Sequence, residues 1–336
     1  MSASAPQQAE NHRGLEHLLP LMEARGVSLD AREFHRIVNL VFHGFESEVY
    51  DSIHIDMKRS LPIVFNALAE AWMSTGAVPR GLRVLDIGCG TGLSSEILMG
   101  TCLGDRIEHL DMLDTSAEML RKCDSRKSLR SASRSLILGT LEQLTPGMSY
   151  DLILTCSVLH HIPDLAEFLD SVSRFQRPCG VFMHVQDPNG DYLDDHELAI
   201  RSQRLENRLL RRARPFTKRL RPKRVLDKLR RHLTGRWEKS YIERVNDELL
   251  SREVITQPLS EIELWQVTDL HVFDGKGVSI KDMRQLLSSY RLVSARAYSF
   301  FGEMCSELPR GLRAEEMRLF SQQAPNGQHI GAIWQK

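Results

Sequence analysis

The stretch of sequence that decides the fold is LRVLDIGCGTG, residues 82–92. Its first half is a short aliphatic run, which is typical of a buried β-strand. Gly88, Gly90 and Gly92 follow at every second position, and glycine lets the chain turn sharply and lets a ligand approach bare backbone. A helical pattern comes next, at 94–99, so free N–H groups and the positive end of a helix dipole would face the turn. The stretch therefore predicts a strand, a ligand-binding turn and a helix.

The residues beside the turn indicate the kind of ligand. A dinucleotide-binding turn has the spacing G-x-G-x-x-G and holds a pyrophosphate, but Leu93 stands where the third glycine would be. Asp86 precedes the turn, and its carboxylate would repel a phosphate and attract a cationic amino group. The turn thus favours a ligand with an ammonium and a carboxylate group. An ordinary tight turn or a nicotinamide-binding loop is the alternative.

Strand and helix patterns alternate along the rest of the chain. The expected strands lie at 83–87, 107–113, 135–138, 150–156, 180–185, 292–300 and 328–335. Helical patterns separate most of these strands, and this rhythm predicts βαβ units in a doubly wound, mostly parallel, Rossmann-like α/β sheet. Right-handed crossovers then bring the carboxyl ends of the strands to one edge, where ligands bind.

The patterns divide the chain into four segments. Residues 1–76 are expected to form an N-terminal helical cap, 77–190 the ligand-binding core, 191–279 an insertion or lid over the substrate, and 280–336 the C-terminal part of the core sheet. Within the insertion, 201–240 contain sixteen Lys or Arg against three Asp or Glu, with leucines at helical spacing. That pattern favours a lid helix with a solvated basic face over a surface for an acidic partner or for nucleic acid.

Composition narrows the class of protein. The formal net charge is zero and 42% of the residues are hydrophobic, so nothing global points to nucleic acid or to a membrane surface. No apolar run reaches the roughly 18 residues that a membrane helix needs, and the N-terminus has no signal-peptide pattern. The six cysteines form no CxxC pair, so neither a zinc site nor a redox dithiol is expected and no metal ligand is assigned. We expect a cytoplasmic protein without a membrane partner.

Four elements in succession resemble the class I S-adenosylmethionine-dependent methyltransferases. They lie at 84–92, 110–120, 138–142 and 150–164. The resemblance implies a sheet of about seven strands whose last strand pairs antiparallel, S-adenosyl-L-methionine as the cofactor, and transfer of its methyl group.

The resemblance also implies which residues bind the cofactor. They are Tyr50, Asp86, Gly88, Gly90, Gly92, Asp114, Thr115, Thr140, Leu141 and Ser157. Asp86 would hold the ammonium group, directly or through water. The carboxylate of Asp114 would accept from both ribose hydroxyls, since its two oxygens match a vicinal diol; Asp111 is the nearby alternative. Thr140 stands where the family often has an acid for the adenine amino group, so that contact would shift to a hydroxyl or to backbone around Thr140 and Leu141.

Three histidines are the candidate catalytic residues: His160, His161 and His271. The first two follow the strand at 150–156, at the ligand edge of the sheet, and histidine is a natural base at neutral pH. Asp269 and His271 would share one face if their segment were a strand. A carboxylate acceptor needs no base, whereas a hydroxyl or amine acceptor must lose a proton.

These observations predict a transferase: an O- or N-methyltransferase that acts on a small-molecule acceptor by in-line displacement. Specialised biosynthesis is one setting for such an acceptor. An RNA or protein methyltransferase that uses the basic insertion is one alternative. A regulatory protein that binds S-adenosylmethionine without turnover is another. Nucleic acid is the less favoured partner, and a homodimer is one option for the oligomeric state.

Overall fold

The computed structural model describes residues 14–76, 78–129, 133–212, 240–273 and 275–336. Most of the basic stretch that the sequence indicates as a lid, 213–239, lies outside these residues. Two 3₁₀ turns belong to the site discussed below, η4 (Leu141–Gln143) and η5 (Leu159–His161).

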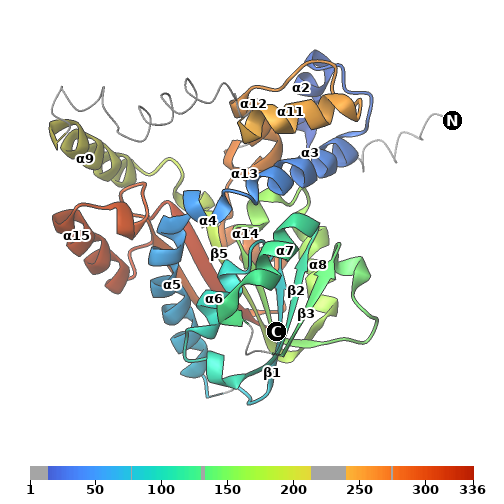
Figure 1. Ribbon diagram of the computed structural model, residues 1–336. Coiled ribbons are helices and arrows are strands. Elements are labelled where there is room, and N and C mark those ends of the chain that lie inside the picture. Colours follow the sequence, from blue (N-terminus) through green and yellow to red (C-terminus); the bar gives the residue numbers. More distant parts are fainter. Residues whose placement is uncertain (1–13, 77, 130–132, 213–239, 274) are drawn as a thin grey trace.

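A seven-stranded sheet forms the centre of the molecule, in the order β3-β2-β1-β4-β5-β7-β6 (Figure 1). The strands are β1 (Leu82–Ile87), β2 (Ile107–Asp114), β3 (Ser133–Leu138), β4 (Tyr150–Cys156), β5 (Gln176–Pro188), β6 (Arg291–Tyr298) and β7 (His329–Gln335). The first five strands pair in parallel, and β7 runs antiparallel to both β5 and β6. The predicted fold class and the antiparallel last strand are confirmed.

One strand, β5, extends well beyond its predicted range. β5 runs from Gln176 to Pro188, well beyond the apolar run at 180–185. Its pairing with β7 shifts register between His184 and Asp187, and Gln186 in this bulge has φ +69°. A bulge of this kind redirects the side chains that follow it, and it lets the strand continue through polar residues to the ligand edge.

Helices cover both faces of the sheet, as a doubly wound fold requires. One face carries α5 (Ile55–Met73), α6 (Leu93–Met99) and α7 (Ala117–Ser125), which share an apolar cluster with the strands. The other face carries α8 (Leu165–Arg174) and α14 (Ile280–Leu286). α9 (His196–Arg212) and α15 (Arg310–Ser321) extend the fold beyond β6 (Figure 1).

A separate group of helices forms a cap at one end of the sheet (Figure 1). It combines α2 (Leu19–Ala24) and α3 (Ala31–Glu46) with α11 (Tyr241–Ser251), α12 (Glu261–Thr268) and α13 (Leu270–Phe273). Phe34, Val38 and Phe42 on one stripe of α3 are buried against side chains such as Val245 and Leu249 of α11. Burying each such side chain stabilises the cap by roughly 1.5–3 kcal/mol. The cap is thus held together by packing between two segments that lie about 200 residues apart in the sequence.

The cap departs from the predictions at two places. α5, within the segment predicted as the N-terminal cap, packs on the sheet beside β6 and β7. The suggestion of a strand around Asp269 and His271 is wrong, because α12 ends at Thr268 and α13 begins at Leu270. The division of the chain into four segments stays a proposal.

Candidate active site

The glycine turn lies at the carboxyl end of β1, and its three glycines have different surroundings. All three have positive φ, +65° at Gly88, +53° at Gly90 and +81° at Gly92. A Cβ on Gly88 would lie 2.6 Å from Cγ2 of Val158, and one on Gly92 would lie 2.7 Å from Sγ of Cys123. A Cβ on Gly90 would meet no atom within 4 Å. Gly88 and Gly92 therefore permit close packing, whereas Gly90 leaves open space where a ligand can approach the backbone.

Asp86 is fully buried beneath this turn. Its Oδ2 accepts hydrogen bonds from the hydroxyls of Ser94 and Ser95, both at 2.6 Å. Its Oδ1 has no partner among the described residues. Burial raises the pKa of Asp86 to about 6, against the lowering effect of the two serines. A buried carboxylate oxygen without a partner is costly, and a cationic ammonium group of a ligand would satisfy it.

Asp114 ends β2 and holds the glycine turn from the other side. Its Oδ2 accepts from the N–H of Gly90 and its Oδ1 from the N–H of Ser116, both at 2.8 Å. Burial raises the pKa of Asp114, although these backbone donors work in the opposite direction. Each carboxylate oxygen keeps a second lone pair, so the side chain can still accept from a diol.

The other predicted cofactor residues surround the same edge. Thr115 and Thr140 are exposed, and the Thr140 hydroxyl donates to Oε1 of Gln143 at 3.1 Å. Leu141 begins η4 and is partly buried. Ser157 follows β4 with φ +60°, and its N–H donates to the carbonyl of Val185 at 2.8 Å. Their contacts with a cofactor stay predictions.

Tyr50 begins α4 (Tyr50–Ile53), a single helical turn between α3 and α5. Burial raises the pKa of its phenol, and the nearby charges of Glu46, Cys156 and Asp114 add to this effect. The ring centroid lies 4.5 Å from that of His54. Tyr50 is thus partly buried beside His54, and its contact with a cofactor stays a prediction.

His160, in η5, has a carboxylate partner on the neighbouring strand. Its Nδ1 lies 2.9 Å from Oδ1 of Asp187 at the end of β5, and its backbone N–H lies 3.3 Å from the same oxygen. Burial alone would raise the pKa of Asp187, but the hydrogen bond from His160 and the nearby imidazole of His184 lower it to about 2. The ionised carboxylate accepts the Nδ1 proton, which leaves Nε2 of His160 as the atom that can accept another.

His161 lies against His160, with ring centroids 4.1 Å apart. Its Nδ1 lies 2.6 Å from the carbonyl oxygen of Thr268, and since a carbonyl only accepts, Nδ1 carries the proton. Burial lowers the pKa of His161 well below its usual value, and the charges of His160 and His43 contribute. His161 is therefore a neutral side chain that ties the cap to the edge of the sheet.

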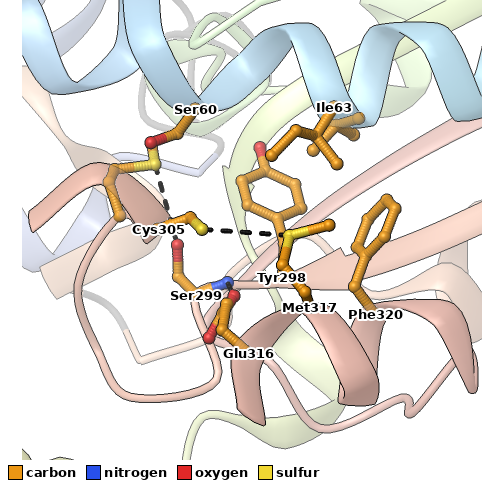
Figure 2. A pocket seen from close by; sticks show the side chains of 10 residues that line it. Ser60, Ile63, Tyr298, Ser299, Cys305, Glu316, Met317 and Phe320 are labelled. Atoms are coloured by element: carbon orange, nitrogen blue, oxygen red, sulfur yellow. Dashed lines mark hydrogen bonds between the residues drawn. The ribbon is translucent and has the colours of Figure 1, made fainter. Parts of the chain in front are cut away.

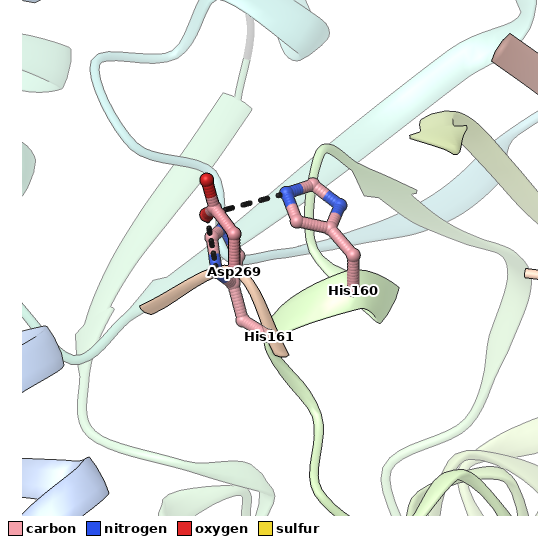
Figure 3. A group of neighbouring side chains, drawn as sticks. All are labelled: His160, His161 and Asp269. Atoms are coloured by element: carbon pink, nitrogen blue, oxygen red, sulfur yellow. Dashed lines mark ion pairs between the residues drawn. The ribbon is translucent and has the colours of Figure 1, made fainter. Parts of the chain in front are cut away.

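Asp269 faces both histidines from the cap (Figure 3). Its Oδ1 lies 3.9 Å from Nε2 of His160 and 3.4 Å from Nδ1 of His161. Ligand atoms of the three side chains lie within 4.8 Å of one another, so they could hold a metal ion, although the sequence assigned no metal. Because Nδ1 of His161 is already bonded to Thr268, an ion bound through that atom would have to replace this hydrogen bond.

His271 takes a different position from the other two histidines. It is buried in α13, and its Nε2 lies 2.9 Å from the carbonyl oxygen of Ile162. This contact joins the cap to the segment after η5. Its role as a catalytic residue stays a prediction.

Sequence reasoning missed a polar group that the cap contributes to this edge. Glu46, only 2% exposed, has Oε2 at 2.9 Å from Nδ1 of His43 and Oε1 at 3.5 Å from Nε2 of His54. Burial would raise the pKa of Glu46, but the two histidines lower it to about 2. The ring of His43 contacts that of His161, with centroids 5.2 Å apart. The i,i+3 spacing of His43 and Glu46 on one helix is a signal that could have revealed them.

Two hollows of the structure lie apart from the histidine edge. The first, between α5, α15 and the end of β6 (Figure 2), has a volume of about 20 Å³, which suffices for a water molecule but not for a metabolite. The second is an open cleft of about 420 Å³ beside α4 and α7, lined by charged residues such as Lys58 and Arg126.

The sheet order, the glycine turn and its two flanking acids together define a class I, Rossmann-like methyltransferase domain. Residues 85–184 match the family model described as "Methyltransferase domain". The chain therefore contains a class I methyltransferase domain, whose methyl donor is S-adenosylmethionine.

Curated relatives match the same part of the chain. A ubiquinone biosynthesis O-methyltransferase of Paramagnetospirillum magneticum is 33% identical over 104 residues, which cover 31% of this chain and 40% of the relative. One of Bordetella bronchiseptica is 25% identical over 159 residues, 47% of this chain and 61% of the relative. The chain thus covers less than two thirds of the length of these relatives.

Solved structures with low sequence identity also match. The plantazolicin methyltransferase BpumL in complex with SAH is 14% identical with a TM-score of 0.45, over 91% of this chain and 97% of that one. A putative sarcosine dimethylglycine methyltransferase of Galdieria sulphuraria is 13% identical with a TM-score of 0.43, over 81% and 85%.

Proposed function

We propose that the protein methylates a small-molecule acceptor at oxygen or nitrogen, with S-adenosylmethionine as the donor. The observation that carries the proposal is the unpaired Oδ1 of the buried Asp86, on the strand that leads into the glycine turn, where Gly90 leaves open space. Bound S-adenosylmethionine supplies an electrophilic methyl group on a sulfonium. Asp86 would hold its ammonium group, and Asp114 its ribose.

The acceptor would bind at the histidine edge, between η5 and the cap. His160 is the best placed of the three candidate bases, because Asp187 orients its ring and leaves Nε2 free for a proton. His161 would line the same space, and Asp269 would contact a donor group of the acceptor from the opposite side. The protein's contribution is then alignment of the nucleophile with the methyl group and removal of one proton.

Two observations of different kinds support a small-molecule acceptor. Buried polar side chains converge between sheet edge and cap, which is typical of sites for small molecules. The curated relatives bear the name O-methyltransferase, which supports oxygen as the accepting atom.

No helix among the described residues is long and apolar enough to cross a membrane. The cytoplasmic location and a homodimer stay predictions.

Calorimetric titration with S-adenosylhomocysteine tests the cofactor half of the proposal. We expect saturable binding by the wild type and at least tenfold weaker binding by Asp114→Ala. Asp124 is an exposed acid at the end of α7. The variant Asp124→Ala is the matched control and should bind like the wild type. No heat with the wild type would contradict the proposal.

A screen of small-molecule acceptors with labelled cofactor tests the catalytic half. Transfer to an acceptor by the wild type, and its loss in His160→Ala with cofactor affinity unchanged, is the expected result. Cofactor binding without transfer to any acceptor, and with label on RNA or protein instead, would favour the alternative that uses the basic insertion.

A further inference from the structure

α4 is fastened to the glycine turn by three side chains that we call the latch: Asp51, Thr91 and Arg126. The hydroxyl of Thr91, between Gly90 and Gly92, donates to Oδ1 of Asp51 at 2.7 Å. Nη2 of Arg126 donates to both carboxylate oxygens of Asp51, at 2.9 and 2.8 Å. Charge-assisted contacts of this kind are stronger than neutral hydrogen bonds.

Arg126 is the fixed side of the latch. Its side chain is only 9% exposed. Its Nε donates to the carbonyl oxygen of Thr91 at 2.7 Å and its Nη2 to the Thr91 hydroxyl at 2.9 Å, while Nη1 pairs with Glu96 of α6. The guanidinium group is thus held by the turn and by the first turn of the helix that follows it.

Asp51 is the free side of the latch. Its side chain is 59% exposed, and the helical turn that carries it is only four residues long. None of the four residues of α4 is buried. Apolar packing therefore does little to hold this helical turn in place. The hydrogen bonds of Asp51 are therefore a main attachment of α4 to the glycine turn.

The position of α4 matters because Tyr50 precedes Asp51. Asp51 is bonded to Thr91, which stands between two glycines of the turn. α4 therefore lies directly beside the turn, and a cofactor bound there would lie next to α4.

We propose that Asp51 and Arg126 are positioning residues of the cofactor site: they fasten α4 to the glycine turn and so slow the release of bound cofactor. The proposal rests on the proposed function, because it presumes a cofactor at the turn. An exposed ion pair contributes little to the stability of the whole fold, so the effect of the latch should be seen in the rate of cofactor release.

Rates of binding and release of S-adenosylhomocysteine, measured by surface plasmon resonance on the full chain, test the latch. Asp51→Asn keeps the shape of the side chain and removes its charge. We expect it to release the ligand about tenfold faster than the wild type, with the melting temperature of the ligand-free protein unchanged. Asp51→Glu, which restores the charge, should recover part of the slow release.

Glu118→Gln is the matched control, since Glu118 forms an exposed pair with Arg121 on the same helix, α7, at 3.2 Å. It should release the ligand at the wild-type rate. Arg126→Lys, alone and combined with Asp51→Asn, supplies a double-mutant cycle, and the double variant should release no faster than the faster single variant.

The outcomes separate the latch from the proposed function. Binding by all variants with equal release rates would overturn the latch and leave the methyltransferase proposal intact. No binding by the wild type would overturn both. A lower melting temperature for ligand-free Asp51→Asn together with unchanged release would assign Asp51 a structural role and also overturn the latch.

Discussion

Nδ1 of His160 lies 2.9 Å from Oδ1 of Asp187, a residue with no exposed surface. The two residues come from neighbouring parallel strands, one just beyond β4 and the other near the end of β5. The bulge at Gln186 directs Asp187 toward the histidine, and the hydroxyl of Tyr298 donates to Oε1 of Gln186 at 2.9 Å. The pair thus follows from a local irregularity of the sheet, which supports its assignment to function rather than to packing.

Asp187→Asn should change the tautomer of His160. A carboxylate accepts the Nδ1 proton, whereas the amide of asparagine can donate to Nδ1 and move the proton to Nε2. Nε2 could then no longer accept a proton, so methyl transfer to a hydroxyl acceptor should fall by about 10²–10⁴-fold. ¹⁵N chemical shifts of the His160 ring report the tautomer directly. Unchanged shifts together with unchanged turnover would contradict the role of the pair.

Cofactor binding should weaken in acid because of Asp86. Its pKa of about 6 in the ligand-free protein means that the carboxyl is protonated below pH 6, while an ammonium group binds the ionised form. Each pH unit below 6 should then weaken binding by up to about tenfold, and binding should level off above about pH 7. The dissociation constant of S-adenosylhomocysteine, measured from pH 5 to 8, checks this.

Asp86→Asn is the variant that isolates this effect. It should bind weakly at every pH, with no acid-side slope. Asp114→Asn should bind weakly but keep the slope of the wild type. A wild-type dissociation constant that stays level between pH 5 and 7 would show that Asp86 does not pair with the ligand.

Gly90→Ala should separate ligand binding from folding. An alanine at positive φ costs about 1–2 kcal/mol, and the new Cβ would occupy the open space at the turn. Gly147→Ala is the matched control, since Gly147 has φ +88°, also has nothing within 4 Å of an added Cβ, and lies on a distant loop. Both variants should lose similar stability, but only Gly90→Ala should lose at least tenfold in affinity for S-adenosylhomocysteine. Equal affinities would argue against ligand contact at Gly90.

The sequence predicts the core of this fold well because its signals are local. The strand, turn and helix at 82–99 lie within one short window, and alternation of strands with helices determines a parallel sheet with few possible topologies. The resemblance assigns Asp86 and Asp114 to the cofactor from the places that they occupy in its motifs, near the ends of two strands. The position of each acid is determined by the few residues around it in the sequence. In the structure both side chains lie at the glycine turn.

The cap and the histidine edge could not be derived in the same way. The sequence predicts helices in residues 1–76, but the partners of α3 in α11 lie about 200 residues away, and nothing local specifies which helix covers which. Asp187 reaches His160 only through the bulge of β5, which the apolar pattern did not indicate. The spacing of Asp269 and His271, two residues apart, is compatible with a strand and equally with a junction between two helices. The sequence suggests the strand, and the structure has the junction. These residues meet through tertiary packing, which a single sequence does not encode locally.

Glu316 in α15 should make the stability of the fold depend on pH. Glu316 is 2% exposed, and its carboxylate accepts the N–H group of Ser299 at 2.8 Å (Figure 2). It also accepts the N–H group of Phe300, at 2.9 Å. Burial raises its pKa from 4.5 to about 7, although the two backbone donors oppose this. Between these two values the folded protein holds a proton that the unfolded chain has lost, so the free energy of unfolding should fall as the pH rises from 4.5 to 7 and stay level above. The change amounts to roughly 3 kcal/mol.

Denaturant unfolding across this range, compared with Glu316→Gln, should show the decline in the wild type and its loss in the variant. Glu315→Gln, which removes the neighbouring acid that pairs with Arg204 and has a lowered pKa, should keep the decline. A difference between the wild type and Glu316→Gln that does not vary with pH would mean that Glu316 is ionised in the folded protein throughout.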